Sequence, residues 1–382
     1  MQILSLNFYL YTISGLWRPI EWPSKCSKIL YSMFTCFIMY LLIILIPIEL
    51  LDILLIENMD DFAMNSLILL SIVNVLVKAT TVITHRDELV NLVEKLQKKP
   101  CKAYNEEENN IQMKFDRMIR SYSVKYTFLS SCSAIGAILG AIFNILKGQL
   151  PFRMRELYDY TLPPLFWFIS IQELMSIIVG TIVNVATETT VLGFCLQICA
   201  QIEILKYRLQ RMIMSSEKKE TPRISLIDES NETGRLSEHI LHHLCIIRLA
   251  KMINKVFSKV IFVQFFDSIC VLCTSLYYLS SHVTIINMIS FFIPALCMLV
   301  QIFVYCWAGN EVILKSTGLS AAMYEMDWIS MPINKQKDLL MIMKRSTRPI
   351  KFTSSFFVTL SLKSYGSLLK ASYSTFNLLR HS

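Results

Sequence analysis

Seven apolar segments, each long enough to cross a lipid bilayer, dominate this chain of 382 residues. A helix needs about 20 mainly apolar residues to span the hydrocarbon core of a membrane. The segments are Ile29–Leu51, Phe62–Thr84, Tyr122–Leu146, Leu162–Leu205, Val256–Leu279, Val283–Trp307 and Phe352–Leu379. The fourth is longer than one crossing, which indicates that it continues beyond the bilayer. The sequence therefore predicts an all-α membrane protein with seven transmembrane helices.

The composition fits this class of protein. Hydrophobic residues make up 54% of the chain and charged residues 17%, with a mean hydropathy of +0.47. Average soluble domains carry about 25% charged residues. Most of the 11 cysteines lie in apolar runs, where a free thiol acts as a small hydrophobe, so no secreted disulfide framework is expected. Residues 3–16 are apolar without the flanks of a signal peptide, and predict an interfacial or buried segment.

The basic residues between the apolar segments predict the orientation of the chain. Lys and Arg gather in segments 85–121, 206–255 and 308–351, whereas segment 52–61 has none. Basic loops of membrane proteins stay in the cytoplasm. With seven crossings, the N-terminus lies on the same side as these three segments, so it is expected in the cytoplasm and the C-terminus outside. These loops also explain the net charge of +8 better than nucleic-acid binding does. The glycosylation sequon at Asn231 would then be cytoplasmic and unmodified.

Motifs of a catalytic or metal site do not stand out. Glu238, His239 and His242 have the spacing of metal ligands on a helix, but no second ligand cluster supports them. Cys270 and Cys273 lie within an apolar segment and are expected to pack there. Neither a nucleophile–base pair nor a Gly-rich phosphate loop is visible. We therefore expect no enzyme activity, no metal and no cofactor.

Several polar side chains occur inside the apolar segments. They are Asn74, Lys78, Glu173, Asn184, Glu188 and Asp267. Such groups are costly in lipid and should face the bundle or a cavity, and each taken singly favours helix packing over ligand contact. Lys78 is expected to reach toward the cytoplasmic interface. Aromatic and aliphatic residues in the outer halves of the middle helices would suit a pocket for a small volatile or lipophilic ligand.

Four stretches of the chain resemble insect odorant receptors. Residues 301–328, QIFVYCWAGNEVILKSTGLSAAMYEMDW, are similar to their sixth helix and the following loop. Residues 367–379, SLLKASYSTFNLL, resemble their seventh-helix signature. Residues 242–266 resemble the entry to the fifth helix, and residues 7–19 resemble the N-terminal opening, whereas the middle of the chain is divergent.

Three other classes of protein were weighed. Gustatory receptors are the nearest, but their seventh helix typically ends with Thr-Tyr and a later Gln-Phe pair, unlike Ser-Tyr-Ser-Thr-Phe at residues 372–376. A G-protein-coupled receptor would begin outside the cell, against the charge distribution. A transporter is disfavoured by the odd number of helices and the lack of a visible inverted repeat.

The resemblance implies an odorant-sensing (tuning) subunit of a heteromeric, odorant-gated, non-selective cation channel. Four subunits, including the odorant co-receptor, would surround one pore in the plasma membrane of an olfactory neuron dendrite, in contact with lipid, odorant and permeating cations. The single domain 1–382 would comprise a cytoplasmic segment 1–28, six helices with the odorant pocket in 29–307, a cytoplasmic anchor in 308–351 and a pore helix in 352–382. The anchor would hold a short helix around residues 334–344.

The resemblance also implies site residues. An odorant would sit between the outer halves of helices two, three, four and six. The candidate contacts by position are Ser71, Asn74, Ile138, Ile142, Trp167, Ser170, Glu173, Met288, Phe291 and Phe292. The seventh-helix motif places Tyr373 in the pore segment, the gate near Phe376, and a second constriction near Leu379 or Arg380. A constriction formed by the apolar Phe376 side chains of the four subunits would close the pore by dewetting.

A polar stripe runs through the same last segment. It consists of Lys363, Ser367, Lys370, Ser374 and Asn377, spaced to share one helix face. Fourfold lysines on a pore axis would repel cations and one another. The stripe is therefore expected to face neighbouring helices or wet crevices between subunits.

Overall fold

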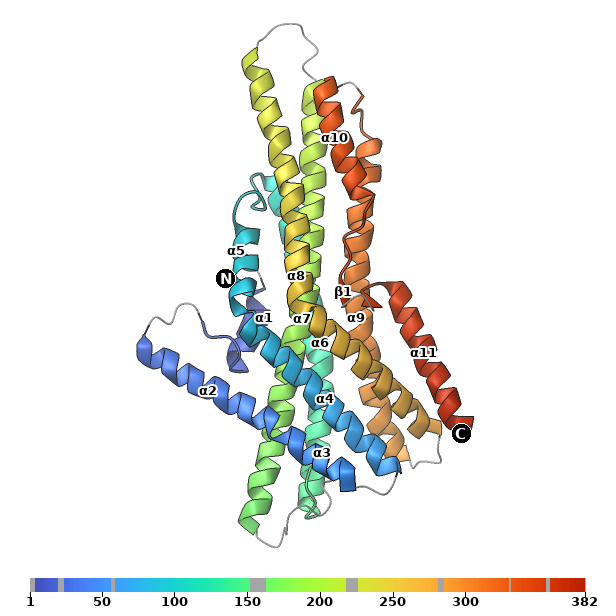
Figure 1. Cartoon of the computed structure of the whole chain (residues 1–382). Coiled ribbons are helices and arrows are strands. Elements are labelled where there is room, and N and C mark those ends of the chain that lie inside the picture. Colours follow the sequence, from blue (N-terminus) through green and yellow to red (C-terminus); the bar gives the residue numbers. More distant parts are fainter. Residues whose placement is uncertain are drawn as a thin grey trace.

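The computed structural model describes residues 4–19, 24–55, 59–151, 163–217, 226–280, 285–329, 331–354 and 358–381. Long helices run through the molecule and give it an elongated shape (Figure 1). They are α6 (Glu106–Leu146), α7 (Pro163–Glu217), α8 (Leu226–Ser280) and α9 (Ile285–Tyr324). The 55 residues of α7 correspond to about 80 Å at 1.5 Å per residue, far more than a hydrocarbon core of about 30 Å. This confirms the prediction that the fourth apolar segment continues beyond the bilayer.

The first helix, α1 (Ser5–Ile13), packs against α7. Its Tyr11 side chain is fully buried and donates a hydrogen bond to the hydroxyl oxygen of Thr187 at 3.2 Å. The rings of Phe8 and Trp17 are also buried and lie with their centroids 4.6 Å apart. The N-terminal apolar segment is therefore a buried helix, one of the two arrangements predicted for residues 3–16.

The first membrane segment is broken into α2 (Lys25–Ile43) and α3 (Leu45–Leu55), which corrects the single helix expected over Ile29–Leu51. Pro47 explains the break, because it has no N–H to donate to the carbonyl of Ile43 one turn earlier. The chain continues through α4 (Met59–Thr84) and α5 (Arg86–Gln97).

Six of the described helical segments are long and apolar enough to cross a membrane. They span residues 25–55, 65–84, 106–146, 164–214, 236–276 and 295–324, and each overlaps one of the first six predicted segments. The last helix, α11 (Leu362–His381), has 20 residues, and its lysines and serines keep it outside this group. The count of seven crossings thus remains a prediction.

The last segment also begins differently from the helix expected at Phe352. Strands β1 (Thr353–Ser354) and β2 (Val358–Thr359) form a short antiparallel hairpin before α11. The Leu360 N–H donates to the Phe352 carbonyl at 2.8 Å, and both side chains are buried. The β-branched residues at positions 353, 358 and 359 favour extended backbone over helix, which accounts for the error.

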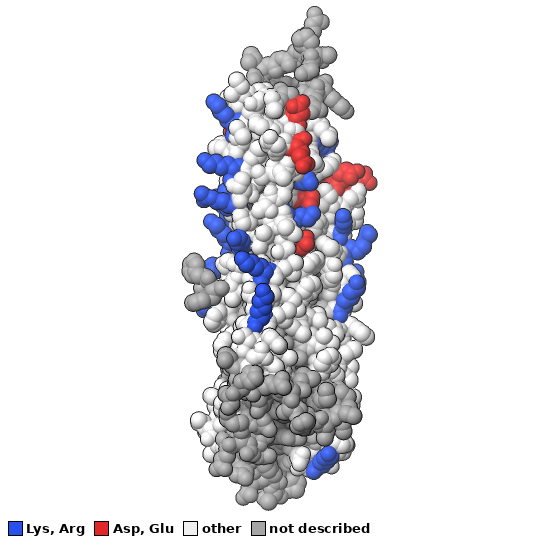
Figure 2. All heavy atoms as spheres, turned by 90° about the vertical axis from the view of Figure 1, so that its right-hand side faces the viewer, with Lys and Arg blue, Asp and Glu red and all other residues white. Residues whose placement is uncertain are grey.

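The basic end of the molecule is formed by described parts of residues 98–120, 201–255 and 310–350. Figure 2 shows Lys and Arg, with some Asp and Glu, gathered over the upper part of one face, toward the end where α10 lies in Figure 1. The helix α10 (Ile333–Ser346) occupies the place where a short helix was predicted around residues 334–344. It packs against α9 and α8.

Arg208 of α7 ties several elements together at the basic end. Its guanidinium binds both carboxylate oxygens of Glu108 on α6, with N–O distances of 3.1 and 2.8 Å. It also donates to the main-chain carbonyls of Pro100 and Lys102, at 2.7 and 2.8 Å. Its Nη1 lies 3.1 Å from Nδ1 of His242, whose Nε2 lies 2.9 Å from the amide oxygen of Gln201. His242 is therefore a neutral partner of buried polar groups on α7, and within the described residues no group of three possible metal ligands occurs.

Candidate functional site

A cavity of about 520 Å³ lies inside the helical bundle, between α4, α6, α7, α8 and α9. Leu42 of α2 and Leu45 of α3 close one side. The walls combine aliphatic side chains with hydroxyl, amide and carboxyl groups, the mixture found in small-molecule sites. The remaining lining residues are Leu67, Ile68, Ser71, Ile72, Asn74, Val75, Tyr126, Ser130, Ser133, Ala134, Ala137, Ser176, Ile177, Gly180, Thr181, Asn184, Asp267, Val271, Ser275, Cys297, Met298 and Gln301.

Small side chains create the space. On α6, Ser130, Ser133, Ala134 and Ala137 stand at positions i, i+3, i+4 and i+7 and so share one helix face. Facing them, α7 contributes a similar run around Gly180. The small side chains leave a volume between the two helices that a ligand can occupy, bordered also by the larger Tyr126 of α6 and Ile177 of α7.

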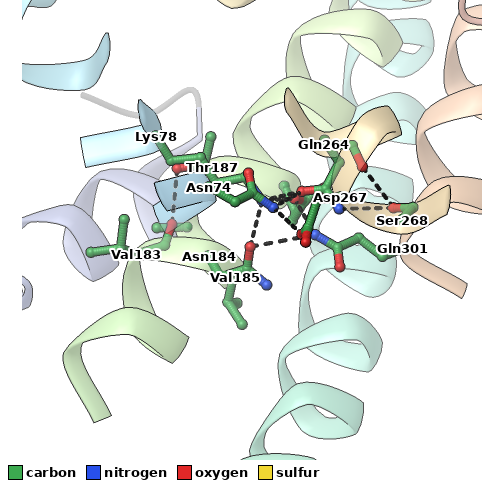
Figure 3. Close-up of polar contacts among 12 residues, drawn as sticks. Asn74, Lys78, Val183, Asn184, Val185, Thr187, Gln264, Asp267, Ser268 and Gln301 are labelled. Atoms are coloured by element: carbon green, nitrogen blue, oxygen red, sulfur yellow. Dashed lines mark hydrogen bonds and ion pairs between the residues drawn. The ribbon is translucent and has the colours of Figure 1, made fainter. Parts of the chain in front are cut away.

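A buried polar network forms the end of the cavity (Figure 3). Lys78 of α4 is fully buried, and its ammonium donates to Glu188 and Asn184 of α7 and to Gln264 of α8. This corrects the expectation that Lys78 reaches toward the interface. A carboxylate and two amide oxygens inside the bundle solvate the ammonium, which removes the reason to extend it into water.

Asn74 and Asp267 extend the network onto the cavity wall. The Asn74 amide nitrogen donates to Asp267 Oδ2 at 2.7 Å and to Gln264 Oε1 at 2.9 Å. From α9, the Gln301 amide donates to Glu188. Four helices, α4, α7, α8 and α9, are therefore joined by one set of polar contacts. This confirms that the polar residues predicted inside the membrane segments face the bundle.

The predicted odorant contacts fall into two groups. Ser71 and Asn74 line the cavity. Ser170 and Glu173 are buried on α7, ahead of Ser176, the first residue of that helix in the cavity lining. By contrast, Ile142 is 40% exposed, Trp167 55% and Phe292 55% in the single subunit, and Ile138 is half-buried beside the lining residue Ala137. The side chains of Met288 and Phe291 lie outside the described residues.

On α7 and α9, the cavity is lined by residues farther along each helix than the predicted contacts. On α7 it is lined from Ser176 to Asn184, whereas the prediction stopped at Glu173. On α9 it is lined from Cys297 to Gln301, whereas the prediction stopped at Phe292. The missed wall on α6 is visible in the sequence as small residues at helical spacing, and Asp267 and Asn184 were visible as intramembrane polar residues.

The last helix presents two different faces. Ser372 and Phe376 are buried against the rest of the subunit, with Phe376 9% exposed. Tyr373 is 61% exposed, and its ring centroid lies 6.3 Å from that of Phe376. The lysines and serines of the polar stripe at positions 363, 367, 370 and 374 are exposed, and Asn377 is half-buried. The side chains of Leu379 and Arg380 lie outside the described residues.

Comparison with known proteins identifies the family. Residues 58–373 match the family model described as 7tm Odorant receptor, which is most of the chain. The chain belongs to the seven-transmembrane odorant receptor family. Members of this family are ligand-gated channels or receptors rather than enzymes.

Individual relatives are distant. The chain is 25% identical over 257 residues to odorant receptor 46a, isoform A, of Drosophila melanogaster, covering 65% of this chain and 64% of that relative. It is 27% identical over 277 residues to odorant receptor 10 of Aedes albopictus, covering 69% and 70% of the two chains. The structure of the olfactory receptor OR5 from Machilis hrabei in complex with eugenol superimposes with a TM-score of 0.81 at 16% identity. That match covers 99% of this odorant receptor and 97% of the other chain, so the two share a fold.

Proposed function

We propose that this protein is the odorant-sensing subunit of a heteromeric, odorant-gated, non-selective cation channel that works with the odorant co-receptor. The observation that carries the proposal is the cavity of about 520 Å³ inside the bundle of a chain from the odorant receptor family. Its mainly apolar wall suits a small volatile molecule, and its few polar groups would orient that molecule. The related fold of the Machilis receptor was solved with eugenol, a molecule of that size class.

The membrane arrangement belongs to the same proposal. In it, α11 is the seventh crossing, the basic end faces the cytoplasm, and the chain resides in the plasma membrane of an olfactory neuron dendrite. Four subunits surround one pore, and described parts of residues 308–351 contribute to an anchor on the cytoplasmic side. The gathering of Lys and Arg over the upper part of the face in Figure 2 supports this orientation.

The pore-lining role falls to α11. Tyr373 and Phe376 lie one turn apart and their rings are neighbours, with Tyr373 reaching out of the subunit and Phe376 packed behind it. We place the gate at this ring pair, with Leu379 and Arg380 forming a second constriction beyond it. Rings from four subunits would dewet a narrow pore, and a small outward movement would admit hydrated cations.

Helix α8 connects the cavity to the pore helix. Asp267 of α8 lines the cavity, and six residues later Cys273 lies with its sulfur 3.6 Å from the main-chain oxygen of Ser372 on α11. A ligand that fits the cavity better when α8 is displaced would shift α11 with it. Such a ligand opens the channel only to the extent that it binds the open arrangement more tightly.

The proposal is tested by co-expressing the chain with the odorant co-receptor and recording currents evoked by a broad odorant panel. We expect an inward current that needs both chains, and whose reversal potential is insensitive to exchange of Na⁺ for K⁺. The co-receptor alone and this chain alone are the controls. Surface-labelled complexes that stay silent to the whole panel would contradict the proposed function.

A further inference from the structure

Three side chains of the polar network, Lys78, Asn74 and Gln301, donate their hydrogens within it. The Lys78 ammonium donates to three oxygens, on Glu188, Asn184 and Gln264. The Asn74 amide nitrogen donates to two oxygens, and the Gln301 amide nitrogen donates to Glu188. A ligand that approaches these nitrogens therefore finds their hydrogens already engaged.

Two acceptors remain without a partner at the cavity. Asn74 Oδ1 and Asp267 Oδ1 are buried and have no hydrogen-bond partner among the described residues. Asn74 is 4% exposed, Asp267 is 1% exposed, and both line the cavity. The amide orientation of Asn74 is fixed, because both atoms bonded to its nitrogen, Gln264 Oε1 and Asp267 Oδ2, are acceptors. A buried acceptor without a hydrogen-bond donor costs free energy. A ligand that donates a hydrogen bond to this acceptor removes the cost and binds more tightly.

Charge and hydroxyl geometry favour the same chemistry. Within the described network the one ammonium of Lys78 faces two carboxyl groups, Glu188 and Asp267, and it is bonded to Glu188. The hydroxyl of Thr181, which lines the cavity one turn of α7 before Asn184, donates to the main-chain carbonyl of Ile177 at 2.8 Å. Its oxygen is left as an acceptor. This end of the cavity is therefore rich in acceptors and has one carboxyl group without a cation.

We propose that the cavity selects ligands by a hydrogen-bond-donating head group that binds between Asn74 Oδ1 and Asp267 Oδ1. This inference rests on the proposed function and specifies its ligand class. A protonated primary amine is the best match, because it supplies several donors and a positive charge opposite the Asp267 carboxyl group. An alcohol supplies one donor and ranks second. An aldehyde or ether of the same carbon skeleton offers only acceptors, which would oppose the acceptors of the wall.

The first test uses the complex of this chain with the odorant co-receptor and four matched probes. They are 2-phenylethylamine, 2-phenylethanol, phenylacetaldehyde and methyl 2-phenylethyl ether, which differ mainly in the head group. We expect half-maximal current at the lowest concentration for the amine, then for the alcohol. The amine should exceed the aldehyde and the ether by about tenfold or more, the value of one charge-assisted hydrogen bond. This ranking needs no variant, so it stands even where a substitution disturbs folding.

The second test uses Asp267→Asn, which keeps the size of the side chain and removes its charge. We expect the potency of the amine to fall about tenfold or more, while the aldehyde keeps or gains potency from the new amide donor. The matched control is Asp116→Asn on α6, an exposed carboxyl group outside the cavity lining whose Oδ1 accepts from Gln197. That control should keep the wild-type ranking of the four probes.

The outcomes separate this inference from the function on which it rests. Equal potencies for the four probes, or an aldehyde more potent than the amine, would overturn the head-group proposal. Silence toward all four probes in cells that respond to other odorants would also overturn it, and would leave the receptor function intact. Silence toward every odorant, with verified surface expression, would count against the proposed function itself.

Discussion

At the scale of single residues, Arg208 is the side chain whose removal should damage the basic end most. It is 7% exposed and joins Glu108, two carbonyls of the loop before α6, and His242. Arg208→Ala leaves the buried Glu108 carboxylate without its ion partner, which costs about 3–5 kcal/mol. We expect a clear loss of thermal stability of the detergent-solubilised complex, measured by fluorescence-detected size exclusion after heating.

The matched control for Arg208 is Lys98→Ala. Lys98 also pairs with a glutamate, Glu94, but the two side chains are 70% and 52% exposed. Exposed pairs contribute about 0–1 kcal/mol, so this substitution should leave the melting profile close to that of the wild type. Equal melting profiles for Arg208→Ala and Lys98→Ala would show that the Arg208 contacts do not stabilise the folded subunit.

The polar network shows the limit of residue-level prediction. That Asn74, Glu188 and Asp267 face the bundle followed from the cost of polar groups in lipid alone. That Lys78 pairs with Glu188 did not, because the two are far apart in sequence and either could have found another partner. Whether Lys78 meets Glu188 depends on the point along their lengths at which α4 and α7 cross. The hydrophobicity of the two helices does not determine that point.

At the scale of elements, the contact between α9 and the start of α11 depends on Gly309. A Cβ added there would overlap Leu360 and would lie 2.6 Å from the Leu360 carbonyl oxygen. Because main chain cannot move aside cheaply, Gly309→Ala should displace the hairpin and the first turn of α11. We expect reduced surface expression, and in the channels that do form, weaker odorant-evoked current at the same surface density.

Gly318→Ala is the control on the same helix. No atom lies within 4 Å of a Cβ built at Gly318, and alanine favours helix over glycine by about 1 kcal/mol. This variant should express and respond like the wild type. If Gly309→Ala behaved in the same way, the close contact between α9 and Leu360 would have no role in placing the pore helix.

The elements could be predicted unevenly from the sequence. Hydropathy located six membrane segments, because each has a long apolar window that tolerates few polar groups. The break at Ile44 was predictable from Pro47, since proline removes a helical donor. The hairpin before α11 was not, because the aromatic residues around position 356 suit a membrane helix as well as extended chain. The residue at its end, Leu360, packs closely against Gly309 of α9.

At the scale of the whole molecule, glycosylation of the sequon at Asn231 would show which side of the membrane the basic end faces. Asn231 lies in the first turns of α8, in the region between the fourth and fifth predicted crossings. If the basic end is cytoplasmic, this asparagine never meets the glycosylation machinery. We expect treatment with a glycan-removing endoglycosidase to leave the mobility of the expressed chain unchanged. A sequon introduced by substitution in segment 52–61 serves as the positive control, and glycan on Asn231 itself would contradict the orientation.

The cavity also belongs to this scale, because residues of seven described helices line it and none of these helices reveals it alone. The sequence indicated a small-molecule pocket between middle helices, but its depth depends on how α6 and α7 pack through their small residues. Of the predicted contacts, Ser71 and Asn74 line the cavity, whereas others such as Trp167 and Phe292 lie on exposed faces.

The central claim is that ligand in this cavity opens the channel, and filling the cavity tests it most directly. Ala134 of α6 lines the cavity, whereas Leu139 of the same helix is 61% exposed and lies outside the lining. We would record concentration–response curves for an active odorant in complexes carrying Ala134→Phe or Leu139→Phe, at matched surface density. The account predicts that Ala134→Phe raises the half-maximal concentration about tenfold or more, or abolishes the current, because the added ring occupies the ligand's space. Wild-type curves for Ala134→Phe, alongside wild-type curves for Leu139→Phe, would contradict it.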